Sequence, residues 1–483
     1  MVRLRTKLTP TDHTARSATS PPRPSSSSGP KPNQHSHNGW TTKRGPVTRS
    51  APRSSPILSG LPARVERVSE SYRIGPLQLT EHTITVPLTT DPGDQRTIDV
   101  FARVVAREGG EDLPHLVYLQ GGPGVEAPRP SLEPTEPSWL PAALEHYRVV
   151  LLDQRGTGRS TPVGDHLLTD RSADEVAEHL THLRADGIVR DAEAMREHLG
   201  VRRWSVLGQS FGGFTLLHYL SRHADSVAEA YFTGGLSAIG RHCDDIYASC
   251  YELMRQLSEA YYRRFPHDRE KVRRLVDLAA AGELVLPDGE VVSVSRLRNV
   301  GHQLGADHGW RSLHWLLELD PRSNAFRYDL AAAMSYRGRN PLYYVLHESS
   351  YADGCVTDWS AERTEPADFA DDPTLFTGEH VRREWLDTVP AFRPWAEVTR
   401  ILAQHDWPQL YDADALRQSG AVGAAAVYLN DAFVPFDLSM ETAALLPGVH
   451  PWVTSEHEHS GLRTSNGRVL ARLIELAKQR RVR

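Results

Sequence analysis

Short apolar runs and helix-like segments alternate along the middle of the chain. Residues 116–119, 148–152, 204–207 and 227–232 are mainly aliphatic or aromatic, which is the pattern of strands buried on both faces. The segment 188–199, between two of these runs, has apolar residues at helical spacing. Strands connected by helices predict parallel βαβ units, and therefore an α/β fold with a mostly parallel central sheet.

Before these runs, apolar and polar residues alternate with a period of two. Leu77–Leu79 and Thr83–Val86 are expected to form strands, and Pro87 closes the second of them. Ile98–Val105 is a further strand, reached through a turn at Asp91–Asp94. We expect these segments to form an antiparallel lead-in to the sheet.

Between residues 240 and 410 the strand pattern fades, and Tyr and Trp become frequent. The helical stretches expected there are Ile246–Phe265, Lys271–Ala280, Trp310–Glu318 and a segment from Glu384 onward. Strand-like runs return at 423–429 and 452–454, and a closing helix is expected at 469–478. We interpret the region as a helical cap inserted before the last strands. The return of the strand pattern argues against the alternative, a separate helical domain.

The predicted organisation has four parts: a tail at 1–60, two parts of an α/β core at 61–239 and 411–483, and the cap at 240–410. The first 56 residues are rich in Ser, Pro and Arg, and hold ten basic residues against one acidic residue, Asp12. They contain too few aliphatic residues to offset chain entropy, so we expect the tail to be disordered. It is either a transit peptide or a solvated extension, and we favour the extension.

The composition excludes some classes of protein. The 483 residues are 39% hydrophobic and 24% charged, as in ordinary globular proteins, and a net charge of −6 gives no indication of nucleic-acid binding. No apolar run reaches the length of a membrane span. Cys243, Cys250 and Cys355 are too few for a disulfide framework and suit a reducing compartment. We therefore expect a cytoplasmic protein without nucleic-acid or membrane partners.

The strongest chemical motif is Gly208-Gln209-Ser210-Phe211-Gly212, between the apolar run 204–207 and a helix-like segment at 214–219. A strand that turns into a helix within so few residues strains the turn residue, and neighbours without a Cβ let strand and helix approach. Such a turn exposes the serine hydroxyl beside the N-terminus of the helix. A bare G-x-S-x-G also occurs by chance, so the flanking elements and two further Gly motifs carry the interpretation.

The first of these motifs is Gly121-Gly122-Pro123-Gly124, which follows the apolar run 116–119. Glycines at the end of a strand let backbone N–H groups face a ligand closely. We expect the N–H groups of Gly122 and Phe211 to form an oxyanion hole, the alternative for the loop being a plain tight turn.

The second motif, Asp153-Gln154-Arg155-Gly156-Thr157-Gly158-Arg159-Ser160, follows the run 148–152. We expect Asp153 and Arg155 to pair and to support the loops of the site. A phosphate site is disfavoured because no G-K-[ST] follows.

Three residues, each just after a predicted strand, are suited to nucleophilic catalysis: Ser210, Asp431 and His459. Their order along the chain is that of α/β hydrolases. An imidazole takes the proton of a weakly nucleophilic hydroxyl, and a carboxylate orients the imidazole. His457 is a rival base and Asp437 a rival acid.

His459 is preferred as the base because the small residues Ser460 and Gly461 beside it leave the ring open to the site. A zinc site at His457 and His459 is disfavoured, because further ligands at suitable spacing are missing.

The three Gly motifs together resemble those of the prolyl aminopeptidases (proline iminopeptidases), serine peptidases of the α/β-hydrolase fold. The resemblance extends from about residue 70 to the C-terminus and is looser in the cap. One departure is Gln120, where the family usually has His before Gly-Gly-Pro-Gly.

The resemblance implies hydrolysis of the bond after an N-terminal proline in small peptides, through an acyl-enzyme and without cofactor or metal. It also implies cap glutamates that hold the substrate amine, here Glu348 and Glu379. A cationic amine in a closed pocket needs such carboxylates, although glutamates are more often exposed. The alternatives are an esterase, a peptidase that releases longer N-terminal pieces, and a non-catalytic binding protein. The intact Ser, Asp and His argue against the last of these.

Overall fold

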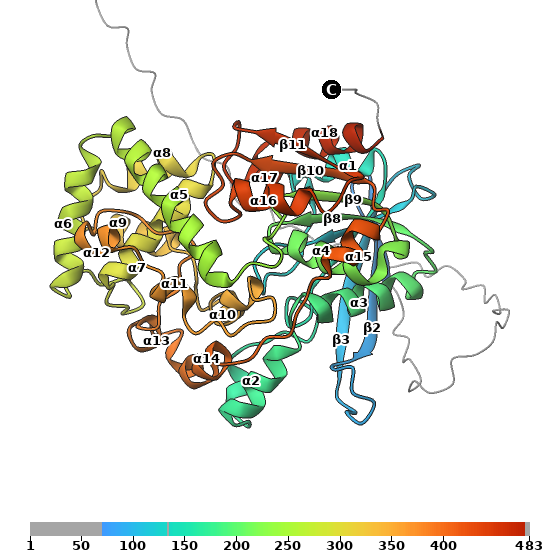
Figure 1. Ribbon diagram of the computed structural model, residues 1–483, viewed down its shortest axis with the longest axis horizontal. Coiled ribbons are helices and arrows are strands. Elements are labelled where there is room, and N and C mark those ends of the chain that lie inside the picture. Colours follow the sequence, from blue (N-terminus) through green and yellow to red (C-terminus); the bar gives the residue numbers. More distant parts are fainter. Residues whose placement is uncertain (1–69, 133–134, 479–483) are drawn as a thin grey trace, which may run out of the picture. The chain divides into compact units, whose positions relative to one another are not determined.

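The computed structural model describes residues 70–132 and 135–478, which contain a sheet in the order β1-β2-β3-β7-β4-β8-β9-β10-β11. Its strands are β1 (Glu70–Ile74), β2 (Leu77–Pro87), β3 (Thr97–Arg107), β4 (His115–Leu119), β7 (Arg148–Leu152), β8 (Trp204–Gln209), β9 (Val227–Thr233), β10 (Gly423–Tyr428) and β11 (Val449–Thr454). The pairs from β1 to β7 are antiparallel, and those from β7 to β11 are parallel. The predicted antiparallel lead-in and mostly parallel sheet are therefore confirmed (Figure 1).

Helices cover both faces of this sheet. They are α1 (Leu140–Leu144), α2 (Ala173–Thr181), α3 (Ala185–His198), α4 (Phe211–His223), α15 (Ala413–Gln418), α16 (Phe436–Ala443), α17 (Gly461–Thr464) and α18 (Arg468–Ala477). Alternate residues of β4 enter different cores: Leu116 and Tyr118 pack with α1 and α18, whereas Val117 and Leu119 pack with α2, α3 and α4. This double burial explains the uninterrupted apolar runs in the parallel strands.

Every element between β9 and β10 is helical, apart from an isolated bridge between Val285 and Val291. We call residues 243–403 the helical insertion; in Figure 1 its helices are grouped beside the sheet. They are α5 (Cys243–Arg264), α6 (Asp268–Ala280), α7 (Val294–Arg298), α8 (Gly309–Leu316), α9 (Asn324–Ala333), α10 (Pro341–Val345), α11 (Ser360–Arg363), α12 (Ala367–Asp371), α13 (Trp385–Thr388) and α14 (Ala396–Ala403). The division at 61–239, 240–410 and 411–483 stays a prediction.

Two sequence expectations need correction. The segments Leu77–Leu79 and Thr83–Val86 belong to one strand, β2, which pairs with β3 along its whole length. The helix expected from Glu384 onward is broken into α13 and α14, because Pro390 and Pro394 fall between them and proline has no N–H for a helical hydrogen bond.

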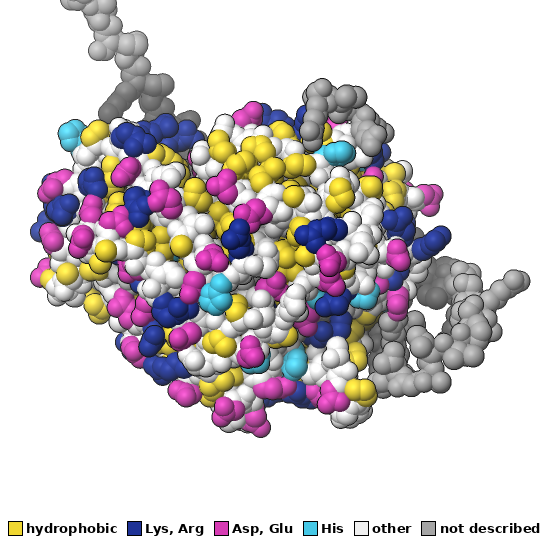
Figure 2. Space-filling model, in the orientation of Figure 1, with side chains coloured by type: hydrophobic (Ala, Val, Ile, Leu, Met, Phe, Trp, Pro, Cys, Tyr) yellow, Lys and Arg dark blue, Asp and Glu magenta, His cyan; other side chains and the backbone are white. Residues whose placement is uncertain are grey.

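The disordered tail predicted at 1–60 lies outside the described residues. Within the described ranges, no helix is both long and apolar enough to cross a bilayer. Acidic and basic side chains are interspersed over the face shown in Figure 2. That face therefore has no broad area of one sign of charge of the kind that binds nucleic acid.

Candidate active site

Ser210 occupies a strained turn between β8 and α4. Its backbone has φ 54° and ψ −125°, a left-handed conformation that is rare for a residue with a side chain. A Cβ on Gly208 would lie 2.5 Å from the carbonyl oxygen of Gly212, and a Cβ on Gly212 would lie 1.9 Å from that of Leu119. Both glycines are thus required for the close approach of strand and helix that the sequence predicted.

His459 and Asp431 form a buried pair at the ends of the last two strands. The Nδ1 of His459 is 2.7 Å from Oδ2 of Asp431. The other carboxylate oxygen of Asp431 accepts the backbone N–H groups of Phe433 and Val434, each at 3.0 Å. These bonds fix the carboxylate, and the carboxylate fixes the imidazole, as the predicted roles require.

Ser210 and this pair both lie against the turn Gly234–Gly235, which follows β9. A Cβ on Gly234 would lie 3.0 Å from Nδ1 of His459 and 3.1 Å from Oδ2 of Asp431. A Cβ on Gly235 would lie 2.9 Å from the carbonyl oxygen of Ser210. The structure therefore brings the three predicted residues to one edge of the sheet, where the parallel strands β8, β10 and β11 end.

The rival residues have other environments. Nδ1 of His457 is 2.6 Å from Oδ2 of Asp307, so its ring is held by a carboxylate of the helical insertion. Asp437 is exposed on α16. The two histidines face different carboxylates, which does not support the zinc site weighed for His457 and His459.

The loop Gly121–Gly124 lies against the serine turn. A Cβ on Gly121 would lie 3.0 Å from Cβ of Ser210, and Gly122 has φ 132°, which favours glycine. Phe211 is the first residue of α4. Both predicted oxyanion-hole donors, Gly122 and Phe211, therefore belong to backbone beside Ser210.

The loop 153–160 supports the site through partners other than those expected. Asp153 forms a bidentate ion pair with Arg129, 2.7 Å at each contact, and Arg155 pairs with Asp191 at 2.6 Å. The predicted pairing of Asp153 with Arg155 is wrong, because Arg129 and the N–H of Arg159 bind the carboxylate of Asp153, whereas the guanidinium of Arg155 reaches α3. Arg155 also donates to the carbonyl of Leu88, so it ties the loop to the core.

Glu379 is mostly buried, with 13% of its side chain exposed, among groups that stabilise its charge. Tyr343 donates a short hydrogen bond to its Oε1, and the hydroxyl of Tyr351 is 3.4 Å from its Oε2. Nε2 of His302 lies 3.6 Å and Nε2 of His347 3.9 Å from the carboxylate. Burial acts to raise the pKa of Glu379, but hydrogen bonding from His302 and the charge of His347 outweigh it and hold the pKa well below its usual value.

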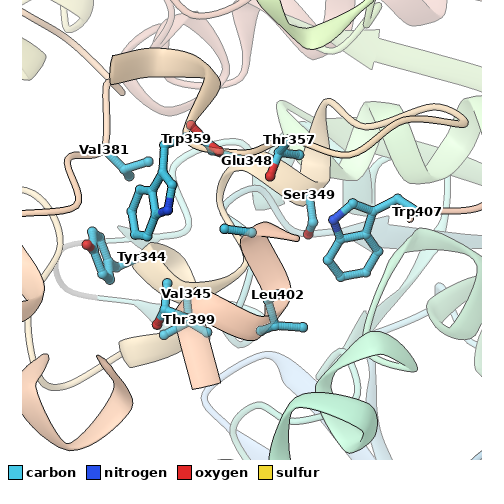
Figure 3. A pocket seen from close by; sticks show the side chains of 11 residues that line it. Tyr344, Val345, Glu348, Ser349, Thr357, Trp359, Val381, Thr399, Leu402 and Trp407 are labelled. Carbon is cyan, nitrogen blue, oxygen red and sulfur yellow. The ribbon is translucent and has the colours of Figure 1, made fainter. Parts of the chain in front are cut away.

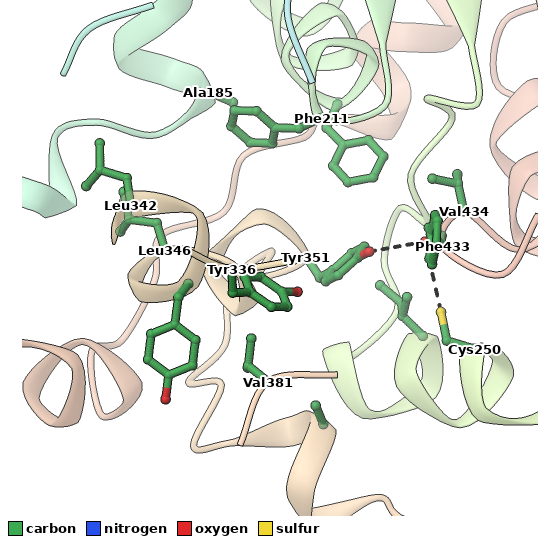
Figure 4. Packing of buried hydrophobic residues seen from close by; sticks show 14 of the residues in the cluster. Ala185, Phe211, Cys250, Tyr336, Leu342, Leu346, Tyr351, Val381, Phe433 and Val434 are labelled. Atoms are coloured by element: carbon green, nitrogen blue, oxygen red, sulfur yellow. Dashed lines mark hydrogen bonds between the residues drawn. The ribbon is translucent and has the colours of Figure 1, made fainter. Parts of the chain in front are cut away.

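One aromatic ring connects this carboxylate with the histidine pair. Phe433 stacks on His302 with ring centroids 5.0 Å apart, and its edge meets His459 at 5.2 Å. The hydroxyl of Tyr351 donates to the carbonyl of Phe433 at 3.1 Å, as Figure 4 shows. Glu379 is therefore linked to the predicted catalytic base through His302 and Phe433.

Glu348 lies in a different setting. Its Oε1 accepts the N–H of Ala361 at 2.9 Å, and burial raises its pKa to about 7. Figure 3 shows it beside Thr357, between Trp359 and Trp407, at a cavity of about 20 Å³. That volume holds about one water molecule. A buried carboxylate with a raised pKa gains stability from a cation, so a role as second amine anchor stays a prediction.

Asp307, in the helical insertion, holds the loop that carries His459, and sequence reasoning missed it. It accepts hydrogen bonds from His457 and from Ser460 Oγ, the latter at 2.9 Å. The N–H of His459 itself donates to the carbonyl of Gly305 at 2.9 Å. No motif marks Asp307, since its partners are 150 residues away in the sequence.

Asp307→Ala is expected to lower the kcat of a reaction that uses His459 as its base by about 10-fold to 100-fold with little change in KM, because a misplaced base slows proton transfer more than binding. Steady-state kinetics check this, and Asp307→Asn, which keeps an acceptor for Ser460, should recover part of kcat. Asp320→Ala, at an exposed carboxylate of the insertion, is the matched control and should match the wild type. A change in KM alone would contradict a positioning role.

Comparisons with known proteins identify the fold and the family of this chain. A model of the alpha/beta hydrolase fold matches residues 114–280. Proline iminopeptidase of Aeromonas sobria is 40% identical over 427 residues, covering 84% of this chain and 98% of that protein. Proline iminopeptidase aneH of Aspergillus aculeatus is 29% identical over 430 residues, covering 84% and 95%. The solved proline iminopeptidase of Mycobacterium smegmatis aligns with 16% identity and a TM-score of 0.39, covering 82% of this chain and 99% of that one.

The sheet order and the serine turn define the class as an α/β hydrolase with a serine nucleophile motif. Within that class, nearly the whole length of the Aeromonas protein is matched at 40% identity. This chain belongs to the proline iminopeptidase family, as its three Gly motifs indicated.

Proposed function

We propose that this protein is a serine aminopeptidase that releases N-terminal proline from small peptides. The observation that carries the proposal is the buried pair of His459 and Asp431 beside the strained turn of Ser210. Membership of the proline iminopeptidase family supports the choice of substrate.

In the proposed reaction, Oγ of Ser210 attacks the carbonyl carbon of the N-terminal proline, and Nε2 of His459 takes the hydroxyl proton. Asp431 stabilises the imidazolium, and the N–H groups of Gly122 and Phe211 hold the oxyanion. His459 then protonates the departing amine, which leaves a prolyl ester on Ser210. Water, deprotonated by His459, hydrolyses that ester and releases proline.

Glu379 is proposed to bind the positively charged amine of the substrate proline. It is ionised, mostly buried and near Phe433 and His459, so an amine bound there lies close to the catalytic base. A fixed position for the amine selects the first residue of a peptide for cleavage. The rings of Tyr351 and Phe433 offer apolar contact for the pyrrolidine ring.

The test compares four substrates: proline anilide, N-acetylproline anilide, glycylproline anilide and a short acyl ester. Free proline anilide is expected to have a kcat/KM at least about a hundredfold above the others. N-acetylproline anilide and the ester lack the cation that the carboxylate binds, and glycylproline anilide carries its amine one residue too far from the anilide bond. Turnover of the ester alone would favour an esterase. Preference for glycylproline anilide would favour a peptidase that releases longer pieces.

A further inference from the structure

Three metal-ligand side chains come together at the start of the helical insertion, away from the groups assigned above. Sγ of Cys243 lies 3.9 Å from Sγ of Cys355 and 3.8 Å from Nδ1 of His242. All three ligand atoms lie within 4.8 Å of one another. Cys243 begins α5, whereas Cys355 belongs to the segment before α11, 112 residues later. Among the described residues, this cluster joins two separate parts of the insertion.

The distances fit a tetrahedral metal better than a disulfide. With metal–sulfur bonds of about 2.3 Å and metal–nitrogen bonds of about 2.1 Å, tetrahedral ligands are separated by about 3.8 Å for two sulfurs and about 3.6 Å for sulfur and nitrogen. The distances of 3.9 and 3.8 Å are close to these values. In a disulfide the sulfurs are about 2 Å apart, so both segments would have to move.

The cluster is partly buried, and one of its residues is open to solvent. Cys243 is fully buried and Cys355 is half-buried, whereas the side chain of His242 is 44% exposed. Nδ1 of His242 accepts the N–H of Asp244 at 3.2 Å, a bond that it must release in order to bind an ion. A cation can therefore reach the two thiols from the side of the exposed His242 ring.

We propose that His242, Cys243 and Cys355 bind a soft divalent cation of the Zn²⁺ type, with solvent at the fourth position. Two thiolates and an imidazole prefer zinc and its analogues over magnesium or calcium, which prefer oxygen ligands. Each thiol loses its proton on binding, and His242 gives up the N–H of Asp244. The bound ion ties the start of α5 to the segment that connects Glu348 with α11.

The test uses reduced, chelator-treated full-length protein and titrates it with Co²⁺ alone. One equivalent per chain should produce a thiolate-to-cobalt charge-transfer band, and Zn²⁺ should displace it. Zn²⁺ should also raise Tm, because an ion that binds only the folded chain stabilises it. A wild type without the band would overturn the proposal.

Single variants locate the ligands. Cys243→Ser and Cys355→Ser should each lose the band, and His242→Ala should weaken Co²⁺ binding. Cys250→Ser is the matched control, since Cys250 is buried on the same helix outside the cluster and its thiol points to the carbonyl of Phe433 (Figure 4). Cys355 is only half-buried, so its serine variant should fold, which circular dichroism checks. A band that persists in Cys355→Ser, or disappears in Cys250→Ser, would refute the site.

Discussion

Ser210→Ala is expected to lower kcat for proline anilide by about 10⁴-fold to 10⁶-fold, because the acyl-enzyme can no longer form. The residual rate reflects binding and the oxyanion hole. Folding should be almost unaffected, since alanine and serine both carry a Cβ at φ 54° and experience the same backbone strain. Steady-state kinetics and thermal unfolding of the variant check both parts.

The control for this variant is Ser221→Ala. Ser221 is also buried on α4, but its hydroxyl donates to the carbonyl of Leu217, one turn back in the same helix. A serine-directed acylating reagent should add one equivalent of label per chain to the wild type and to Ser221→Ala, and none to Ser210→Ala. If Ser210→Ala kept more than about a tenth of the wild-type kcat, the nucleophile would lie elsewhere.

The sheet could be predicted because its signals are local. The central parallel strands are buried on both faces, so β7 and β10 appear in the sequence as short apolar runs. The turn at Ser210 is equally local. Gly208 is needed because the carbonyl of Gly212 lies against it, and Gly212 is needed because the carbonyl of Leu119, in a neighbouring strand, lies against it. The order serine, acid, histidine along the chain then indicated Asp431 and His459, each of which follows a predicted strand.

The remaining features depend on contacts that no local pattern records. Asp307 and Cys355 each meet partners more than a hundred positions away, and neither belongs to a recognisable motif. Arg155 was paired with Asp153 because the two are close in sequence, whereas the fold gives it Asp191 from α3. Helical spacing in the insertion predicts α5, but not that this helix packs against α11.

Glu379→Gln is expected to lower kcat/KM for proline anilide by about 10²-fold to 10³-fold, mainly through KM. Loss of one charge from a buried ion pair costs about 2–5 kcal/mol, and each 1.4 kcal/mol is tenfold. The amide keeps the size of the side chain and can still accept from Tyr343, so the fold should be retained. Kinetics with proline anilide and with an uncharged acyl ester check this. The ester carries no amine, so its turnover should not depend on the charge of Glu379.

Glu348→Gln separates the two proposed anchors. Because the pKa of Glu348 is raised to about 7, this carboxylate becomes protonated as the pH falls through 7, and any attraction it has for the amine is lost there. The pKa of Glu379 is lowered, so Glu379 stays ionised over the same range. If Glu348 is an anchor, kcat/KM should fall more steeply below pH 7 in the wild type than in Glu348→Gln.

Glu441→Gln removes an exposed glutamate that pairs with Arg241, and it should match the wild type at every pH. If Glu379→Gln lowered kcat/KM equally for the anilide and the ester, this carboxylate would support the folded structure of the site rather than bind the amine. In that case the free amine would need another carboxylate, and the titration of Glu348 would become the decisive measurement. If instead kcat/KM fell for the anilide and stayed unchanged for the ester, Glu379 would be the residue that selects substrates by their free N-terminal amine.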